Sequence, residues 1–298
     1  MKYFIFLSFF CISVVGHFPV WAQGFQLPEV PAGLTAPADR ADYLAVHYWD
    51  YFDFSDTALI HRPEITEQAF VDFLSVLHYS DRSRAAVDTL LSRAEVNEAM
   101  LTHFMELSEK YLYEPDSPLC NEELYIDVLR SLSGRLVLPE AERIRLGNQL
   151  ELVSKNRPGK VAANFDFLRR DGRCGRLSEV KAGFVLLYFN DPGCEDCRRT
   201  AARIAASPVF SFLQKRDSAE SNRLTVLSVC IGNDREAWQS TVSPPGWIDG
   251  FDEKQQIING GAYHLKMVPT LYLLDKDKRV ILKDTTVEQV EGWLKHLM

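Results

Sequence analysis

Apolar residues recur with a helical period through residues 39–155. Spacings of i, i+3, i+4 and i+7 begin at Phe70 and return along 100–111, 124–132 and 144–153. A stripe of this kind lets each helix turn one face towards a shared core. The pattern predicts an all-α N-terminal domain of about five helices.

The period changes after the breaker cluster Asn-Arg-Pro-Gly at residues 156–159, which predicts a domain boundary between 157 and 158. Continuous apolar runs now dominate, and runs of this length suit strands buried in a sheet. Strands are predicted at 161–168 and 177 around a turn at 171–173, and at 184–189, 224–230, 270–274 and 279–282. An amphipathic helix follows at 286–297. Strands that alternate with helices predict an α/β domain over 158–298.

The first 22 residues have the order of a secretory signal. Lys2 supplies a positive charge, residues 3–15 are almost entirely apolar, and Val20-Trp21-Ala22 resembles a cleavage site. A membrane anchor is less consistent, because the apolar stretch is shorter than the roughly 20 residues of a spanning helix. A lipoprotein cysteine at Cys11 is disfavoured, because Phe9-Phe10 precedes it. We predict a signal peptide at 1–22, a helical domain at 23–157, no later membrane span, and a periplasmic or secreted protein of the cell envelope.

The net charge and the cysteine count limit the classes of ligand and chemistry that fit this chain. The 298 residues carry a net charge of −8, which makes nucleic acid a poor ligand. Signal cleavage removes one of six cysteines and leaves an odd number in a compartment where disulfides persist. Cys230 lies in an apolar run and is expected to be a core residue, whereas Cys120 and Cys174 either pair with each other or stay free.

The sharpest motif is Cys194-Glu195-Asp196-Cys197, which follows the predicted strand 184–189 and opens a helix. A Cys-x-x-Cys pair between a strand and a helix is typical of a redox site. The helix N-terminus stabilises a thiolate on Cys194, whereas Cys197 lies one turn deeper. Cys194 is therefore the predicted nucleophile and Cys197 the resolving thiol.

Other uses of the pair fit less well. Zinc needs four ligands and no second Cys-x-x-Cys is present, whereas haem attachment needs a histidine where Arg198 stands. A thiol peroxidase of the peroxiredoxin type usually has a threonine where Asp191 stands. The remaining alternative is a structural disulfide between the two cysteines that does not turn over. We expect no metal and no cofactor.

The segment from Pro158 onwards resembles the thioredoxin fold, in the form of the bacterial envelope thiol–disulfide oxidoreductases of the TlpA/ResA type. The matching pieces are Pro-Gly-Lys at 158–160, Phe-Asp-Phe at 165–167, Asp-Gly at 171–172, Leu-Ser-Glu-Val at 177–180, the cysteine pair, and Val-Pro-Thr at 268–270. The helical half resembles a domain of unknown function that precedes thioredoxin domains, on the aromatic run at residues 47–54. That run either packs into the core, which we favour, or forms a surface for a partner.

The resemblance implies further site residues. Pro269 is expected to be cis and to face the cysteines, Val268 to offer its backbone to a substrate strand, and Gly193 to lie at the substrate side of Cys194. The chain departs from the family where Tyr188 takes the place of the buried acid that thioredoxin uses for proton transfer. No proton acceptor follows from the sequence.

Three carboxylates, on Asp191, Glu195 and Asp196, surround Cys194 and disfavour its thiolate, although two arginines follow. A less stable thiolate makes a more reducing couple. We predict a thiol–disulfide oxidoreductase with a redox-active Cys-x-x-Cys centre that reduces protein disulfides and is regenerated by another redox protein. The alternatives are a thioredoxin-fold binding module without turnover and a thiol peroxidase.

Overall fold

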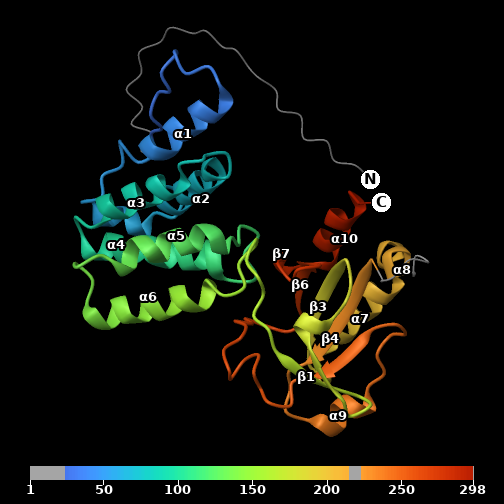
Figure 1. The fold of residues 1–298 in the computed structure, drawn as a ribbon. Helices are drawn as coiled ribbons and strands as arrows, with labels where there is room; N and C mark the ends of the chain where they lie inside the picture. The colour runs from blue at the N-terminus through green and yellow to red at the C-terminus, as the bar shows by residue number, and fades with distance from the viewer. Residues whose placement is uncertain (1–23, 215–222, 298) are drawn as a thin grey trace. The chain divides into compact units, whose positions relative to one another are not determined.

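The computed structural model describes residues 24–214 and 223–297 (Figure 1). The predicted signal peptide lies outside these ranges. The chain forms two compact units, one up to His103 and one from Phe104 onwards. Within the described ranges, no helix combines the length and the apolar character that crossing a membrane requires.

The first unit is built from helices that bury one apolar stripe each. Phe70, Phe73 and Leu77 lie on the buried side of α2. The aromatic run supports the same core, because Tyr48 and Trp49 are buried and both contact the ring of Phe73. Packing into the core is thus confirmed for Tyr48, Trp49 and Phe54, whereas Tyr51 of the same run is exposed. The elements are α1 (Pro37–His47), a 3-10 turn (Thr57–His61), α2 (Thr66–Leu77) and α3 (Ser83–Ala94), and α4 (Glu98–Ser108) spans the division between the units.

Two further helices precede the sheet in the second unit. A π-helical turn (Glu109–Tyr113) extends α4, and α5 (Glu122–Ser133) and α6 (Glu140–Val153) follow. The described ranges thus hold six α-helices before the sheet, one more than the periodicity predicts. The stripe of α3 is weak in the sequence, because alanines form part of its buried face. The break at 156–159 separates helices from strands, and the domain boundary at 157 stays a prediction.

The second unit contains a seven-stranded mixed sheet in the order β2-β1-β5-β4-β3-β6-β7. The central strands β3, β4 and β5 are parallel, whereas β6, β7, β1 and β2 pair antiparallel with their neighbours. The strands are β1 (Asp166–Arg169), β2 (Cys174–Arg176), β3 (Phe184–Asn190), β4 (Leu224–Cys230), β5 (Ile248–Phe251), β6 (Thr270–Asp275) and β7 (Val280–Thr285).

Three helices pack on one face of this sheet, through a cluster that joins Ile204, Phe210 and Val290 to Leu186 and Leu273. They are α7 (Glu195–Ala206), α8 (Pro208–Gln214) and α10 (Val287–Lys295), and α9 (Arg235–Ser240) follows β4. The predicted α/β thioredoxin-like domain after an all-α region is confirmed. The prediction of a strand at Leu177 is wrong: the residue begins a 3-10 turn (Leu177–Glu179), because the hairpin partner β2 already ends at Arg176.

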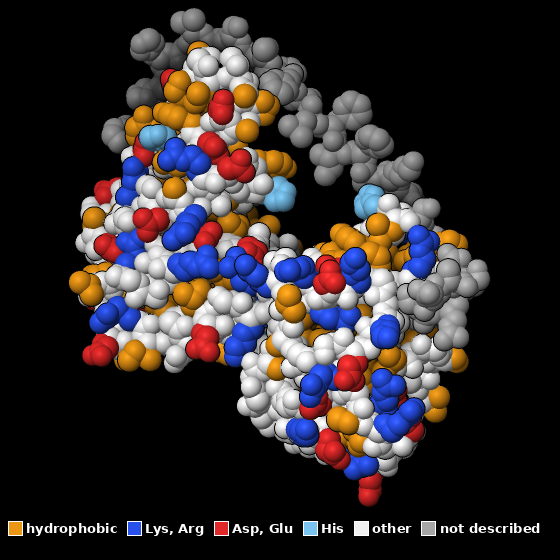
Figure 2. Space-filling model, in the orientation of Figure 1, with side chains coloured by type: hydrophobic (Ala, Val, Ile, Leu, Met, Phe, Trp, Pro, Cys, Tyr) orange, Lys and Arg blue, Asp and Glu red, His pale blue; other side chains and the backbone are white. Residues whose placement is uncertain are grey.

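Strand register explains how distant segments meet at the site. In the antiparallel pair β3–β6, Phe189 lies opposite Thr270. The chain that leaves β3 towards the cysteines therefore meets the chain that enters β6 through Val268 and Pro269. On the face seen in Figure 2, side chains of both charges are interspersed with hydrophobic ones.

Candidate active site

The cysteine pair lies at the start of α7. Cys194 is the N-cap residue, with extended backbone angles, and its Sγ accepts a hydrogen bond from the Cys197 N–H at 3.0 Å. The alanine-rich sequence that follows favours a helix, and Glu195 and Asp196 in the first turn match the positive end of the helix dipole. The sequence thus places both sulfurs at a helix N-terminus, as the motif predicts.

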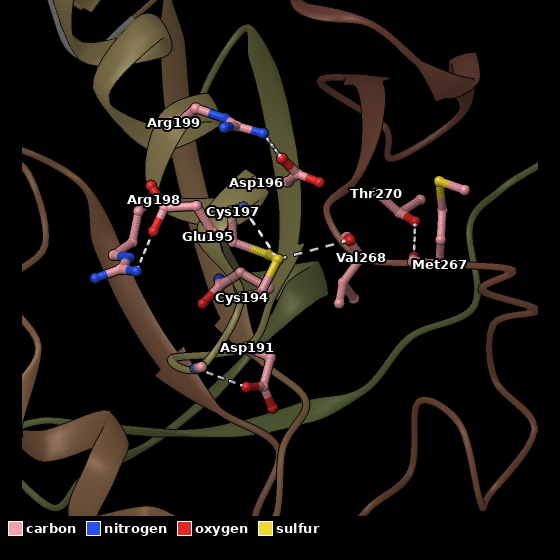
Figure 3. Close-up of a disulfide and its surroundings, with 12 residues drawn as sticks. Asp191, Cys194, Glu195, Asp196, Cys197, Arg198, Arg199, Met267, Val268 and Thr270 are labelled. Atoms are coloured by element: carbon pink, nitrogen blue, oxygen red, sulfur yellow. Dashed lines mark hydrogen bonds and ion pairs between the residues drawn. A yellow bond between two sulfur atoms is a disulfide. The ribbon is translucent and has the colours of Figure 1, made fainter. Parts of the chain in front are cut away.

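The two cysteines form a disulfide, with their Cα atoms 5.2 Å apart (Figure 3). Cys197 is 3% exposed, whereas Cys194 is partly exposed. An incoming thiol or disulfide therefore reaches Cys194 first. This is the order of access that a nucleophile and a resolving thiol require.

The loop before β6 lies against Cys194. The Val268–Pro269 peptide bond is cis, as the resemblance implies, and the Val268 carbonyl oxygen lies 3.7 Å from the Cys194 Sγ (Figure 3). The hydroxyl of Thr270 donates to the Met267 carbonyl at 2.5 Å and ties the loop to the start of the strand. The structure thus brings Val268 and Pro269 to the cysteines from about 70 residues further along the chain.

Gly193 lies in the exposed turn directly before Cys194. Its N–H donates to Asp191 Oδ1 at 2.8 Å, and the Cys194 N–H donates to the Asp191 carbonyl at 3.1 Å. A side chain at position 193 would bring a Cβ to 3.2 Å from Asp191 Oδ1. A side chain at this position would therefore crowd the Asp191 carboxylate, one oxygen of which is already used in the turn.

The two acidic residues inside the motif pair with the arginines that follow. Glu195 forms an ion pair with Arg198, and Asp196 with Arg199, each three residues apart on α7 (Figure 3). All four side chains are more than 60% exposed, so water screens both pairs and their net contribution is small. Among the three carboxylates near the sulfurs, Asp191 is therefore the one whose negative charge is not offset by an arginine.

Tyr188 occupies the buried position beneath the pair. Its hydroxyl donates to the Cys197 carbonyl at 2.6 Å. Burial raises the pKa of Tyr188 well above its ordinary value, so the phenol stays protonated and does not accept a proton from Cys197. Its role in the fold is to fix the first turn of α7, and Trp247 packs against its ring at a centroid distance of 6.0 Å.

The remaining described cysteines do not pair. Cys120 and Cys174 are exposed and free, and Cys230 is fully buried in β4. Burial raises the pKa of the Cys230 thiol to about 11, which makes it a core residue of low reactivity, as predicted.

Comparisons with known proteins agree with this architecture. Residues 12–156 match a family described as a domain of unknown function, DUF5106. The thiol-disulfide oxidoreductase ResA of Bacillus thuringiensis (strain Al Hakam) is 25% identical over 150 residues, covering 47% of this chain and 78% of ResA. The ResA protein of Bacillus anthracis is likewise 25% identical over 150 residues, with the same coverage.

A solved structure covers both parts of the chain. The crystal structure of a thioredoxin-like protein from Bacteroides caccae is 38% identical, covers 92% of this chain and 99% of its own, and superposes with a TM-score of 0.86. The chain therefore belongs to the thioredoxin-like proteins, joining a DUF5106 region to a domain homologous to the ResA-type thiol–disulfide oxidoreductases.

Proposed function

We propose that the protein is a thiol–disulfide oxidoreductase that reduces disulfides in other proteins outside the cytosol. The observation that carries the proposal is the Cys194–Cys197 disulfide at the start of α7, with one sulfur accessible and one buried. The secretory pattern of residues 1–22 supports the location.

The reaction starts from the dithiol form. The Cys194 thiolate, favoured by the helix N-terminus, attacks one sulfur of the substrate disulfide, and the departing substrate sulfur takes up a proton. Cys197 then loses its proton and attacks the Cys194 sulfur of the mixed disulfide. This step releases the second substrate thiol and leaves Cys194 and Cys197 oxidised. Two electrons and two protons pass to the substrate, and a separate dithiol protein restores the reduced pair.

The backbone beside Cys194 supports a role in holding the substrate. The Val268 carbonyl lies 3.7 Å from the reacting sulfur and can accept a hydrogen bond from an extended substrate segment. Gly193 is exposed directly before Cys194 and has no side chain for that segment to meet. We assign substrate binding to Val268, Pro269 and Gly193, and chemistry to Cys194 and Cys197.

A redox titration tests this function and its direction. Because Asp191, the carboxylate near Cys194 without an arginine partner, disfavours the thiolate, we expect a single two-electron couple nearer to roughly −270 mV than to the roughly −120 mV of a strong oxidant. Protein equilibrated in dithiothreitol or glutathione buffers of known potential is alkylated, and the modified cysteines are identified by mass spectrometry.

A variant that lacks Cys120 and Cys174 is the control, and its potential should be unchanged. A value near roughly −120 mV would reverse the proposed direction. If the Cys194–Cys197 disulfide does not exchange with the buffers, the proposed activity is wrong and a binding module without turnover is favoured.

A further inference from the structure

A cavity of about 570 Å³ opens beside the cis-proline loop, entirely within the second unit. One wall is the segment that leads into α5, residues 115–123. The opposite walls are the loop at 266–270 and the turn from β7 into α10, residues 283–289. The strands and α10 supply only the last two walls, so the helical segment adds a third wall to this partly open cavity.

The cavity is continuous with the proposed substrate site. Met267, Pro269 and Thr270 line it, whereas the Val268 carbonyl between them faces Cys194. Successive Cα atoms lie about 3.8 Å apart, so a substrate held at Val268 reaches the cavity one or two residues from its reacting cysteine.

The two lysines of the cavity have used their hydrogen-bond donors. Lys283 Nζ contacts Glu122 Oε2 at 2.7 Å and donates to the carbonyls of Val153 and Lys155. Lys266 Nζ contacts Glu122 Oε1 at 2.8 Å and donates to the Tyr113 carbonyl at 2.7 Å, over the ring of the same tyrosine. An ammonium group has three N–H donors. Neither lysine is therefore available to an anionic ligand.

Asp284 is the acid of the cavity that no lysine or arginine of the described residues holds in an ion pair, because both cavity lysines pair with Glu122. It lines the cavity as an exposed residue, and the Tyr272 hydroxyl interacts with its carboxylate. Glu122 is held by the lysines, and Glu123 by Arg157. Desolvation and the negative charge of Glu122 raise the pKa of Asp284 to about 6, although Lys283, Lys266 and the Tyr272 hydroxyl oppose the shift. A cation that enters the cavity would therefore stabilise the charged form of the Asp284 carboxylate.

We propose that this cavity is a subsite for a lysine or arginine side chain close to the reacting cysteine of the substrate protein, with Asp284 as its anionic partner. The walls suit the aliphatic stem of such a side chain, because Pro115, Pro118, Pro269 and Met267 are apolar. The subsite rests on the proposed function and specifies its substrates: proteins whose disulfide lies beside a basic residue.

Matched peptide disulfides test the subsite on the full chain. The peptides differ only in carrying lysine, norleucine or glutamate at one of the two positions on either side of the cysteine. At pH 7.5 we expect kcat/KM for reduction of the best-placed lysine peptide to exceed that of its glutamate counterpart about tenfold. Asp284→Asn should bring the ratio close to one and leave the norleucine peptide within about twofold of wild type.

The variant is chosen to preserve the fold. Asp284 has a φ of 47°, in the left-handed region that asparagine tolerates well. The residue is exposed and the amide has the same shape as the carboxylate, so the unfolding midpoint should stay close to that of wild type. Asp277→Asn, in the exposed β6–β7 turn, is the control and should keep the wild-type preference.

The preference should also depend on pH. Asp284 loses its charge as the pH falls through about 6, so the lysine-to-glutamate ratio should shrink towards one at pH 5. Equal rates for lysine and glutamate peptides in wild type, or an undiminished preference in Asp284→Asn, would overturn the subsite while leaving the oxidoreductase intact. Failure to reduce any peptide, norleucine included, would overturn the proposed function and the subsite together.

Discussion

Replacement of Cys197 by serine is expected to stop turnover and to accumulate mixed disulfides between Cys194 and substrate proteins. Cys194 is the accessible sulfur at the helix N-terminus, so the first attack still proceeds. Cys197 is 3% exposed and bonded to Cys194 in the oxidised form, so its loss removes the thiol that resolves the complex. Non-reducing electrophoresis followed by mass spectrometry detects the trapped species and maps the linkage.

Cys194→Ser is the matched variant and should trap nothing, because the remaining sulfur is buried beneath the first turn of α7. Multiple-turnover reduction should fall at least about a thousandfold in both variants, as expected when a covalent step is removed. Equal trapping by Cys194→Ser, or mixed disulfides mapped to Cys120, would show that Cys194 is not the nucleophile.

Glu122→Gln is expected to destabilise the second unit by about 3 kcal/mol, since it removes one partner from a largely buried charge cluster. Glu122 is 12% exposed and contacts Lys266 and Lys283, which are 11% and 6% exposed. Burial alone raises the pKa of Glu122, but the two ammonium groups outweigh it and hold the pKa below its ordinary value. At pH 7 the carboxylate is therefore ionised and stabilising. Urea unfolding followed by circular dichroism measures the loss.

The neighbouring residue provides the control. Glu123 lies in the same first turn of α5 but is 48% exposed and pairs with Arg157 at the surface. Glu123→Gln should change the free energy of unfolding by less than about 1 kcal/mol. Similar losses in both variants would indicate an effect on the helix dipole, which the two positions share, and would refute the role of the buried cluster.

Much of the α/β fold follows from local patterns. The runs that became β3, β4 and β6 are buried on both faces of the sheet, so most of their residues are apolar and the signal is nearly continuous. The cysteine motif is an equally local signal, because a spacing of two residues at the start of a helix brings the two sulfurs close together. Two short elements were not predicted. β5 spans four residues and α9 spans six, which is too few for a hydrophobic period to be recognised.

The cavity could not be predicted from sequence because its groups come from separate elements. Glu122 starts α5, Lys266 lies in the loop before β6, and Asp284 lies near the end of β7, with no shared spacing or motif. Packing alone brings them together. The hydrogen bond from Tyr188 to the Cys197 carbonyl has the same origin: the residue type was apparent, but its orientation depends on how α7 lies on the sheet.

The most direct test of the central claim is a count of cysteine thiols before and after one round of reaction. The reduced protein is mixed with a substrate disulfide in the absence of other thiols, quenched with an alkylating reagent and mapped by mass spectrometry. Each substrate disulfide reduced should remove two thiols from the protein, those of Cys194 and Cys197, while Cys120, Cys174 and Cys230 remain thiols. Substrate reduction without loss of those two thiols, or no reduction by the fully reduced protein, would contradict the claim.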